Sequence, residues 1–407
     1  MKEIIVIGGG ASGMAAAISA AKKGANVTIL EFNDILGKKI LSTGNGRCNL
    51  TNLYMNPECF RGDDPDFIHN VLEKISLEEI IKFFEELQIF TKNRDDYVYP
   101  RCDQASSVRH AFEMRLKQLG VEIVTGVHIE EIVKTKNGYV LKDHTSTKQY
   151  SAKKIILACG SKASSISGSD GSGYTLARQL GHSISSIAPA LVQLRSEDKS
   201  FSKLGGVRAD ASVSLFIDGH KMAEDKGELQ LTNYGISGIP VFQVSRYASK
   251  ALLEKKRVTT VVDFVPEMDE LYFTNYILNR CRSSKHIMSC EILNSIFHEK
   301  LISVLLMKSD INKTVWAEKI NEEKWIKFCH LCKNYEIIIS ATNSFEQAQI
   351  CAGGVRTNEI NPSTMESNYS KGAYITGELL DVDGICGGYN LHFAWISGIL
   401  AGSAAAE

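Results

Sequence analysis

The sequence predicts an α/β fold in which the two ends of the chain build one parallel-sheet domain and the middle forms an insertion. At the N-terminus, the apolar runs Lys2–Ile7 and Val27–Leu30 flank the alanine-rich segment Ala11–Lys23, in the order strand, helix, strand. Near the C-terminus, a strand at Ala373–Thr376 leads through a glycine turn into a helix that begins near Tyr389. With 407 residues, the chain is long enough for two or three domains.

The insertion begins near Ile187, where short alternating runs replace the βαβ pattern. Strand-like runs separated by turns indicate a compact β substructure, and they are Leu191–Leu194, Ala211–Ile217, Glu228–Thr232 and Val258–Phe264. Helical spacing of apolar residues follows in Glu267–Lys308 and Glu322–Lys333. We therefore expect a discontinuous outer domain of residues 1–187 and 351–407, an inserted β-barrel-like domain of residues 188–266 and 334–350, and a small helical domain of residues 267–333.

The outer domain carries further elements before the insertion. The apolar patterns predict helices within Pro65–Leu87 and Gln104–Leu119, and strands at Tyr97–Pro100, Val121–Val133, Gly138–Asp143 and Lys154–Ala158. The last of these strands ends on glycine, as the first strand does.

Composition and charge exclude several classes of protein. The net charge of −1 gives no electrostatic footprint for nucleic acid or for an anionic membrane. The N-terminus lacks the pattern of a signal peptide, and no apolar run is long enough to span a bilayer. We expect a cytoplasmic protein with a small-molecule substrate and no nucleic-acid or membrane partner, while the oligomeric state is left open.

The ten cysteines show no framework of regular pairs. The one close pair, Cys329 and Cys332, lies in a helical stretch and has no second CxxC to complete a zinc site. We therefore expect packed thiols and no metal site.

A dinucleotide fingerprint, Gly8-x-Gly10-x-x-Gly13, stands between the first strand and its helix. Gly8 permits the sharp turn, Gly10 lets a pyrophosphate approach the backbone, and Gly13 allows close contact of helix and sheet. Ala11 and Ser12 open the helix, whose free N–H groups and dipole favour phosphate. Glu31 ends the second strand, where a carboxylate accepts hydrogen bonds from both ribose hydroxyls and repels a 2′-phosphate. The pattern predicts a Rossmann-type domain that binds FAD or NAD rather than NADP.

Three longer motifs identify a family. They are Gly37–Leu41 followed by Gly44-Asn-Gly-Arg-Cys-Asn49, then Gly227–Gly238, and a tail from Ala352–Val355 through Met365–Ser367 to Thr376–Asp381 and Gly387–Asn390. In order and over essentially the whole chain, they resemble the BaiN-like (YhiN-type) family of FAD-dependent oxidoreductases. The resemblance implies FAD as the cofactor.

The resemblance also implies where the cofactor lies. Glu378 is expected at the ribityl or pyrophosphate region, Gly160 at a second ADP-contacting turn, and Ile129 at the adenine edge. The helix that begins at Gly388 is expected to point its N–H groups at the flavin, where negative charge collects on reduction. The candidate cofactor residues are Gly8, Gly10, Ala11, Ser12, Gly13, Glu31, Lys39, Gly46, Arg47, Cys48, Asn49, Ile129, Ala158, Gly160, Gly377, Glu378, Gly388, Tyr389 and Asn390. For Cys48, packing is favoured over a redox role because it has no CxxC partner.

The chemistry is expected to need a proton donor, and hydroxyl side chains suit that role. Tyr234 is the first candidate, Tyr389 the second and His392 the third, with Arg47 as a further candidate; a buried, satisfied polar ring is the alternative for each aromatic residue. We expect a reductase of an activated C=C bond in an apolar ring compound, bile-acid-like or steroid-like as the resemblance implies. No second dinucleotide domain is visible in the sequence. NADH or NADPH would therefore have to visit the same flavin face as the substrate, or another protein would be the electron donor. The alternatives are a flavin amine oxidase that forms peroxide, and a non-enzymatic flavin-binding sensor or RNA-associated factor.

Overall fold

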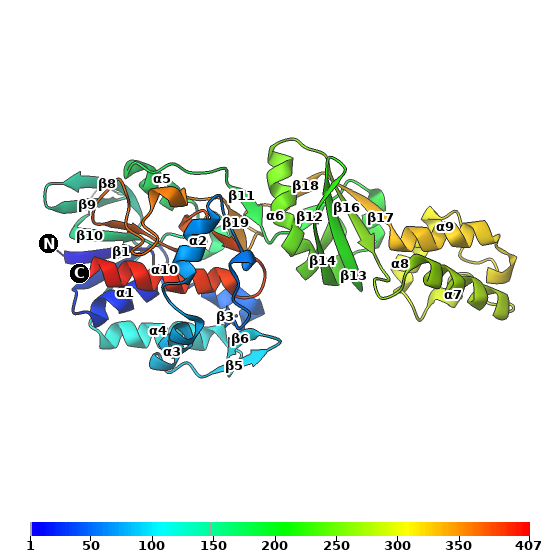
Figure 1. The fold of residues 1–407 in the computed structure, drawn as a ribbon, viewed down its shortest axis with the longest axis horizontal. Helices are drawn as coiled ribbons and strands as arrows, with labels where there is room; N and C mark the ends of the chain where they lie inside the picture. Colours follow the sequence, from blue (N-terminus) through cyan, green and yellow to red (C-terminus); the bar gives the residue numbers. More distant parts are fainter. Residues whose placement is uncertain (1, 146–147) are drawn as a thin grey trace. The chain divides into compact units, whose positions relative to one another are not determined.

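The computed structural model describes residues 2–145 and 148–407 (Figure 1). It divides into two compact units, one of Met1–Ile187 with Gln349–Glu407 and one of Ala188–Ala348. The first unit therefore joins the two ends of the chain. A separate third domain at residues 267–333 stays a prediction.

A central sheet organises the first unit. Its order is β7-β2-β1-β10-β9-β8, with β20 beside β10. The strands β7, β2, β1, β10 and β20 are parallel, and β9 and β8 extend the sheet as an antiparallel hairpin. Apolar strands such as the first suit the centre of a parallel sheet because helices cover both faces. The bounds are β1 Lys2–Ile7, β2 Val27–Glu31, β7 Glu122–Thr125, β8 Ile129–Thr135, β9 Gly138–Asp143, β10 Gln149–Leu157 and β20 Ala373–Ile375.

The first and last helices pack against each other (Figure 1). These are α1, Ala11–Lys22, and α10, Tyr389–Ala405. A Cβ added to Gly398 would lie 2.3 Å from the carbonyl oxygen of Ser12, and one on Gly402 would lie 2.0 Å from that of Ala16. The small residues of both helices thus permit backbone contact, which ties the C-terminal segment to the N-terminal unit.

The other elements of the first unit lie around this sheet. They are α2 Pro65–Leu72, α3 Leu77–Glu86, α4 Ala105–Gln118, α5 Ser172–Gln179, β3 Thr51–Asn52, β4 Phe60–Arg61, β5 Thr91–Arg94, β6 Tyr97–Pro100, β19 Ile350–Ala352 and β21 Asp383–Gly384. The helix expected over Pro65–Leu87 is two helices, because Ser76 and Glu79 form a capping box that starts α3.

The second unit is built on an antiparallel sheet of order β17-β16-β13-β14-β15-β12-β18. The bounds are β12 Leu194–Arg195, β13 Val207–Ile217, β14 His220–Leu231, β15 Gly235–Gly238, β16 Val258–Asp263, β17 Tyr335–Ile339 and β18 Ala341–Thr342, with the short β11 at Ala188–Ala190. A helix that the sequence reasoning did not predict, α6 at Ile239–Leu253, packs against β13, β14 and β15. The barrel-like insertion thus takes the form of an open sheet with a helix on it.

The helical part of the second unit contains α7, Glu270–Ser283, α8, Glu299–Lys308, and α9, Glu322–Lys333. The last of these has the predicted bounds. Trp325 and Phe328 on α9 are fully buried in the core of this unit, which explains the apolar spacing seen in the sequence.

Candidate functional site

The three fingerprint glycines have different surroundings, as the fingerprint requires. Gly8 has φ +102°, and a Cβ there would lie 2.5 Å from the carbonyl oxygen of Ala158. A Cβ on Gly13 would lie 2.0 Å from the carbonyl oxygen of Gly8. A Cβ on Gly10, in contrast, would meet no described atom within 4 Å. Gly8 and Gly13 therefore serve packing, whereas Gly10 leaves open space at the N-terminus of α1, where a diphosphate fits.

Glu31 is held beside this turn. Its Oε2 accepts a hydrogen bond of 2.6 Å from the Gly9 N–H, and its Oε1 accepts two of 2.7 Å from the backbone and side chain of Asn33. The side chain is only 7% exposed. Its carboxylate is thus fixed at the C-terminal end of β2, the position of a ribose-binding acid.

The loop before β8 lies against the same strand end. The N–H of Val127 donates to the carbonyl of Glu31 over 2.9 Å, and Ile129 then begins β8 opposite Asp143. Gly160, with φ +71°, follows the end of β10. These positions agree with an adenosine site bounded by the ends of β2, β8 and β10.

A second polar group brings distant segments of the first unit together. Glu378 Oε2 lies 2.6 Å from Lys39 Nζ and accepts a hydrogen bond of 2.9 Å from Ser161 Oγ. Gly377 has φ +65°, its N–H donates to Ser397 Oγ over 3.0 Å, and a Cβ on it would lie 2.7 Å from Ser12 Oγ. The structure therefore assembles the predicted Ser12, Lys39, Gly377 and Glu378. Sequence reasoning missed Ser161 and Ser397, although Ser161 directly follows the predicted Gly160.

The N-terminus of α10 lies against Asn49 and Thr51, where the Gly44-Asn-Gly-Arg-Cys-Asn49 motif leads into β3. A Cβ on Gly388, where φ is +93°, would lie 2.8 Å from both Asn49 Oδ1 and the Thr51 carbonyl oxygen. Asn52 Nδ2 donates to the Gly387 carbonyl over 3.0 Å. Asn49 Oδ1 is buried and has no hydrogen-bond partner among the residues that the structure describes. An acceptor of this kind beside free helix N–H groups fits a flavin ring, which offers both N–H donors and carbonyl oxygens.

Two predicted residues of α10 are engaged in structural contacts. The side chain of Asn390 exchanges hydrogen bonds of 2.8 and 2.9 Å with the backbone of Gly384, so its backbone alone can serve a ligand. Tyr389 is buried, its hydroxyl donates to the Tyr54 carbonyl over 2.9 Å, and its ring meets Phe60 edge-on. Burial raises the pKa of Tyr389. This geometry is that of a satisfied ring rather than of a proton donor.

His392 is also a buried ring. Its Nδ1 lies 2.8 Å from Thr51 Oγ1, and burial lowers the pKa of His392 to about 3, so the imidazole is neutral at physiological pH.

Arg47 is exposed at the end of the short helical segment Ile40–Gly46. Gly46 has φ +83° in the same segment.

Three of the cysteines are fully buried packing groups, namely Cys48, Cys329 and Cys332. Burial raises the pKa of Cys48 to about 12, so its thiol is protonated at neutral pH. Burial also raises the pKa of Cys329 to about 12 and that of Cys332 well above its usual value, on the inner side of α9. None of these three thiols therefore has the lowered pKa that is typical of a redox-active cysteine.

Tyr234, in the second unit, belongs to a polar network. Asn343 Nδ2 donates to its hydroxyl over 3.0 Å, and the Arg195 guanidinium carbon lies 4.6 Å from the ring centroid. Arg195 Nη1 donates to Asn343 Oδ1 over 3.0 Å, and Asn343 Nδ2 also lies 3.3 Å from Gln193 Oε1. Because the amide is the donor, the tyrosine hydroxyl keeps its own hydrogen for another acceptor. Arg195, Asn343 and Gln193 were not predicted from the sequence.

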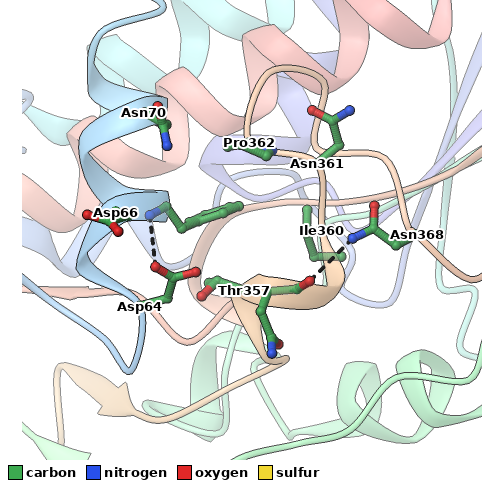
Figure 2. Close-up of a pocket in the computed structure, with 10 residues that line it drawn as sticks. Asp64, Asp66, Asn70, Thr357, Ile360, Asn361, Pro362 and Asn368 are labelled. Atoms are coloured by element: carbon green, nitrogen blue, oxygen red, sulfur yellow. Dashed lines mark hydrogen bonds between the residues drawn. The ribbon is translucent and has the colours of Figure 1, made fainter.

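A pocket of about 390 Å³ in the first unit lies between α2 and the 357–368 segment (Figure 2). Asp64, Phe67, Asn70 and Asn361 are among its lining residues. None of the predicted cofactor residues lines it, so it is distinct from the fingerprint site.

Three features define an FAD-dependent oxidoreductase of Rossmann type. They are the glycine fingerprint, the Glu31 carboxylate at the end of β2, and Asn49 beside the N-terminus of α10. The family model described as HI0933-like protein Rossmann domain matches residues 2–404, and the chain belongs to this family. The resemblance seen in the sequence motifs is thereby confirmed.

Two curated relatives match nearly the whole chain. The chain is 48% identical over 409 residues to the 3-dehydro-bile acid delta(4,6)-reductase of Clostridium scindens, covering 100% of each chain. It is 28% identical over 404 residues to the ribosomal RNA dihydrouridine synthase of Haemophilus influenzae, covering 97% of this chain and 96% of that one.

Solved structures show the same fold at low identity. A flavocytochrome c3 fumarate reductase in its open conformation aligns with a TM-score of 0.52 at 14% identity, covering 100% of this chain and 78% of that one. The 3-ketosteroid delta1-dehydrogenase of Sterolibacterium denitrificans aligns with a TM-score of 0.52 at 10% identity, covering 99% of both. Within the part of the chain that the structure describes, every helix is too short or too polar to cross a lipid bilayer.

Proposed function

We propose that this protein reduces a C=C bond conjugated to a carbonyl group in an apolar ring compound of bile-acid or steroid type, with NADH or NADPH as hydride donor. The observation that carries the proposal is the 48% identity, over the full length of both chains, to a reductase of a 3-dehydro-bile acid. The name of the second relative, a dihydrouridine synthase, also denotes saturation of a ring C=C bond next to a carbonyl. Reduction of a conjugated C=C bond is thus the chemistry that the two names share.

Such a reduction needs a proton at the carbon next to the carbonyl. The flavin, when bound, supplies a hydride equivalent, and we assign the proton to the Tyr234 hydroxyl. The Asn343 amide donates to the phenolic oxygen and so favours the phenolate left after transfer. The Arg195 guanidinium over the ring favours the same negative charge. Tyr234 is half-buried, so solvent can restore its proton.

The cofactor-holding roles follow from the first unit. Glu31 would accept from the ribose hydroxyls, and the open backbone at Gly10 would adjoin the pyrophosphate. Lys39 and Glu378 would contact the ribityl or pyrophosphate region, and Asn49 with the start of α10 would border the ring. The contacts described above support each of these assignments.

Anaerobic half-reactions test the proposal. FAD-loaded protein is mixed anaerobically with NADH, NADPH or an amine. The reduced flavin is then mixed with a 3-oxo-Δ4 steroid, a 3-oxo-Δ4,6 bile acid, ribosomal RNA, buffer alone or aerated buffer. We expect bleaching by a nicotinamide and rapid reoxidation by the enones, with slow reoxidation in air. Bleaching by amines alone, followed by fast reoxidation in air, would establish an amine oxidase instead. Turnover of uridine in ribosomal RNA without turnover of the enones would also refute the assigned substrate class.

A further inference from the structure

We propose that His128, Glu130 and His144 form a binding site for a divalent transition-metal ion such as Zn²⁺. Glu130 lies on β8, His128 directly precedes β8, and His144 directly follows β9. All three are outside the fingerprint and outside the Tyr234 network. One ligand atom of each lies within 4.8 Å of those of the other two.

The strand register explains why the three side chains meet. Ile129 pairs with Asp143, and the His144 N–H donates to the His128 carbonyl over 2.8 Å, so the two histidines are direct cross-strand neighbours. Side chains at cross-strand positions lie on the same face of a sheet. The register shifts between Ile129 and Glu131, which makes Glu130 the extra residue of a β-bulge. Bulges re-aim side chains, and here Glu130 Oε1 lies 2.6 Å from His144 Nδ1.

His128 adds a second observation that is independent of the strand register. Its Nε2 is buried and has no hydrogen-bond partner among the described residues. Asp170 Oδ2 lies 3.5 Å from this nitrogen, on the loop that directly precedes α5. Asp170 is therefore placed as a candidate fourth ligand, and it completes a set of two imidazoles and two carboxylates.

This donor set selects the class of ion. Imidazole nitrogen with carboxylate oxygen suits Zn²⁺, Ni²⁺ and Co²⁺, whereas Mg²⁺ and Ca²⁺ prefer oxygen alone. Ligand atoms around Zn²⁺ stand about 3.4 Å apart at bond lengths near 2.1 Å. Atoms that lie within 4.8 Å of one another must therefore close by at most about 1.4 Å. The side chains of His144 and Glu130 are 69% and 51% exposed, which leaves them free to turn inward.

The site adjoins the adenosine end of the cofactor region. The ring of His128 lies 4.9 Å from that of Phe32, which directly follows Glu31. A bound ion would therefore link the start of β8 to the end of β9, close to Glu31, which is proposed to bind the ribose.

Calorimetric titration of the FAD-loaded protein with ZnCl₂ tests the proposal, with bound Co²⁺ absorption as a second measurement. We expect one Zn²⁺ ion per chain. The Zn²⁺ affinity of His144→Ala should be at least roughly tenfold lower than that of the wild type, because even the loss of a group that only supports a metal ligand lowers the affinity by about 10–100-fold. His69→Ala is the matched control. His69 forms an exposed pair with Glu73 at 3.1 Å, and among the residues that the structure describes it belongs to no cluster of potential metal ligands. It should bind Zn²⁺ as the wild type does.

The outcomes separate a built site from adventitious binding. Absence of Zn²⁺ binding to the wild type would overturn the proposal, and so would equal affinity in the wild type and His144→Ala. His128→Ala is a second ligand variant. Because the His128 ring packs on Phe32, circular dichroism must establish that this variant folds, whereas His144 is exposed and its replacement should leave the fold unchanged. Loss of binding in both variants and retention in His69→Ala is the result that the geometry predicts.

Discussion

Replacing Tyr234 by Phe removes one hydroxyl from the Tyr234 network and leaves the ring under Arg195 in place. Proton transfer by a positioned side chain contributes about 10²–10⁴-fold to a rate, and we expect the reoxidation of reduced flavin by an enone to slow within that range. The stability cost is small. Asn343 Nδ2 loses its 3.0 Å partner but keeps Gln193 Oε1 at 3.3 Å, so the unsatisfied-donor penalty stays near the low end, about 1 kcal/mol.

Stopped-flow absorption measures the two half-reactions of Tyr234→Phe separately. Flavin reduction by the nicotinamide should be unchanged, because no proton from Tyr234 enters that step, while the enone half-reaction should be slow. Tyr389→Phe is the matched control, since it removes a hydroxyl bonded to the Tyr54 carbonyl and should lower stability by about 1 kcal/mol without a comparable kinetic effect. An enone half-reaction in Tyr234→Phe within about threefold of the wild-type rate would refute the assignment, because it is far below the range for a lost proton donor.

Two further predictions concern buried groups near the start of α10. Burial lowers the pKa of His392 from its ordinary 6.5 to about 3, so the unfolded chain binds the proton first and stability falls as the pH drops below 6.5. Urea unfolding should show His392 costing about 1.4 kcal/mol at pH 5.5 relative to pH 7.5, and this increment should vanish in His392→Asn; an unchanged pH dependence in the variant would contradict the assignment. Because burial raises the pKa of Cys48 to about 12, native protein should resist iodoacetamide at this thiol and Cys48→Ala should retain wild-type half-reaction rates. Mass spectrometry measures the alkylation of Cys48. Rapid alkylation, together with slowed half-reactions in Cys48→Ala, would instead reveal a redox thiol.

Local patterns made the outer domain predictable. The turn at Gly8, Gly10 and Gly13 is specified within a few residues. In the second unit the same holds for α9, whose apolar spacing predicts both of its ends. The helix α6 was missed although its signal was present, since Val241, Val244, Ala248 and Ala251 are buried at helical spacing.

The side-chain partners could not be predicted in the same way. Asn343 is 109 residues from Tyr234 and 148 from Arg195, so only the pairing of β12 with β15 and β18 brings them together. His128 and His144 meet through a strand register and a bulge, neither of which the sequence alone specifies. Sequence motifs thus located the cofactor region, and tertiary register supplied the networks.

Titration of the apo-protein with FAD measures whether the opening strand, turn and helix hold the cofactor. Flavin fluorescence should show one FAD bound per wild-type chain. Gly10→Ala should bind more weakly while melting at the wild-type temperature, because its Cβ meets no described atom and projects only into the proposed ligand space. A wild-type chain that quenches no flavin fluorescence, or a Gly10→Ala variant with undiminished affinity, would show that FAD is not bound at this turn.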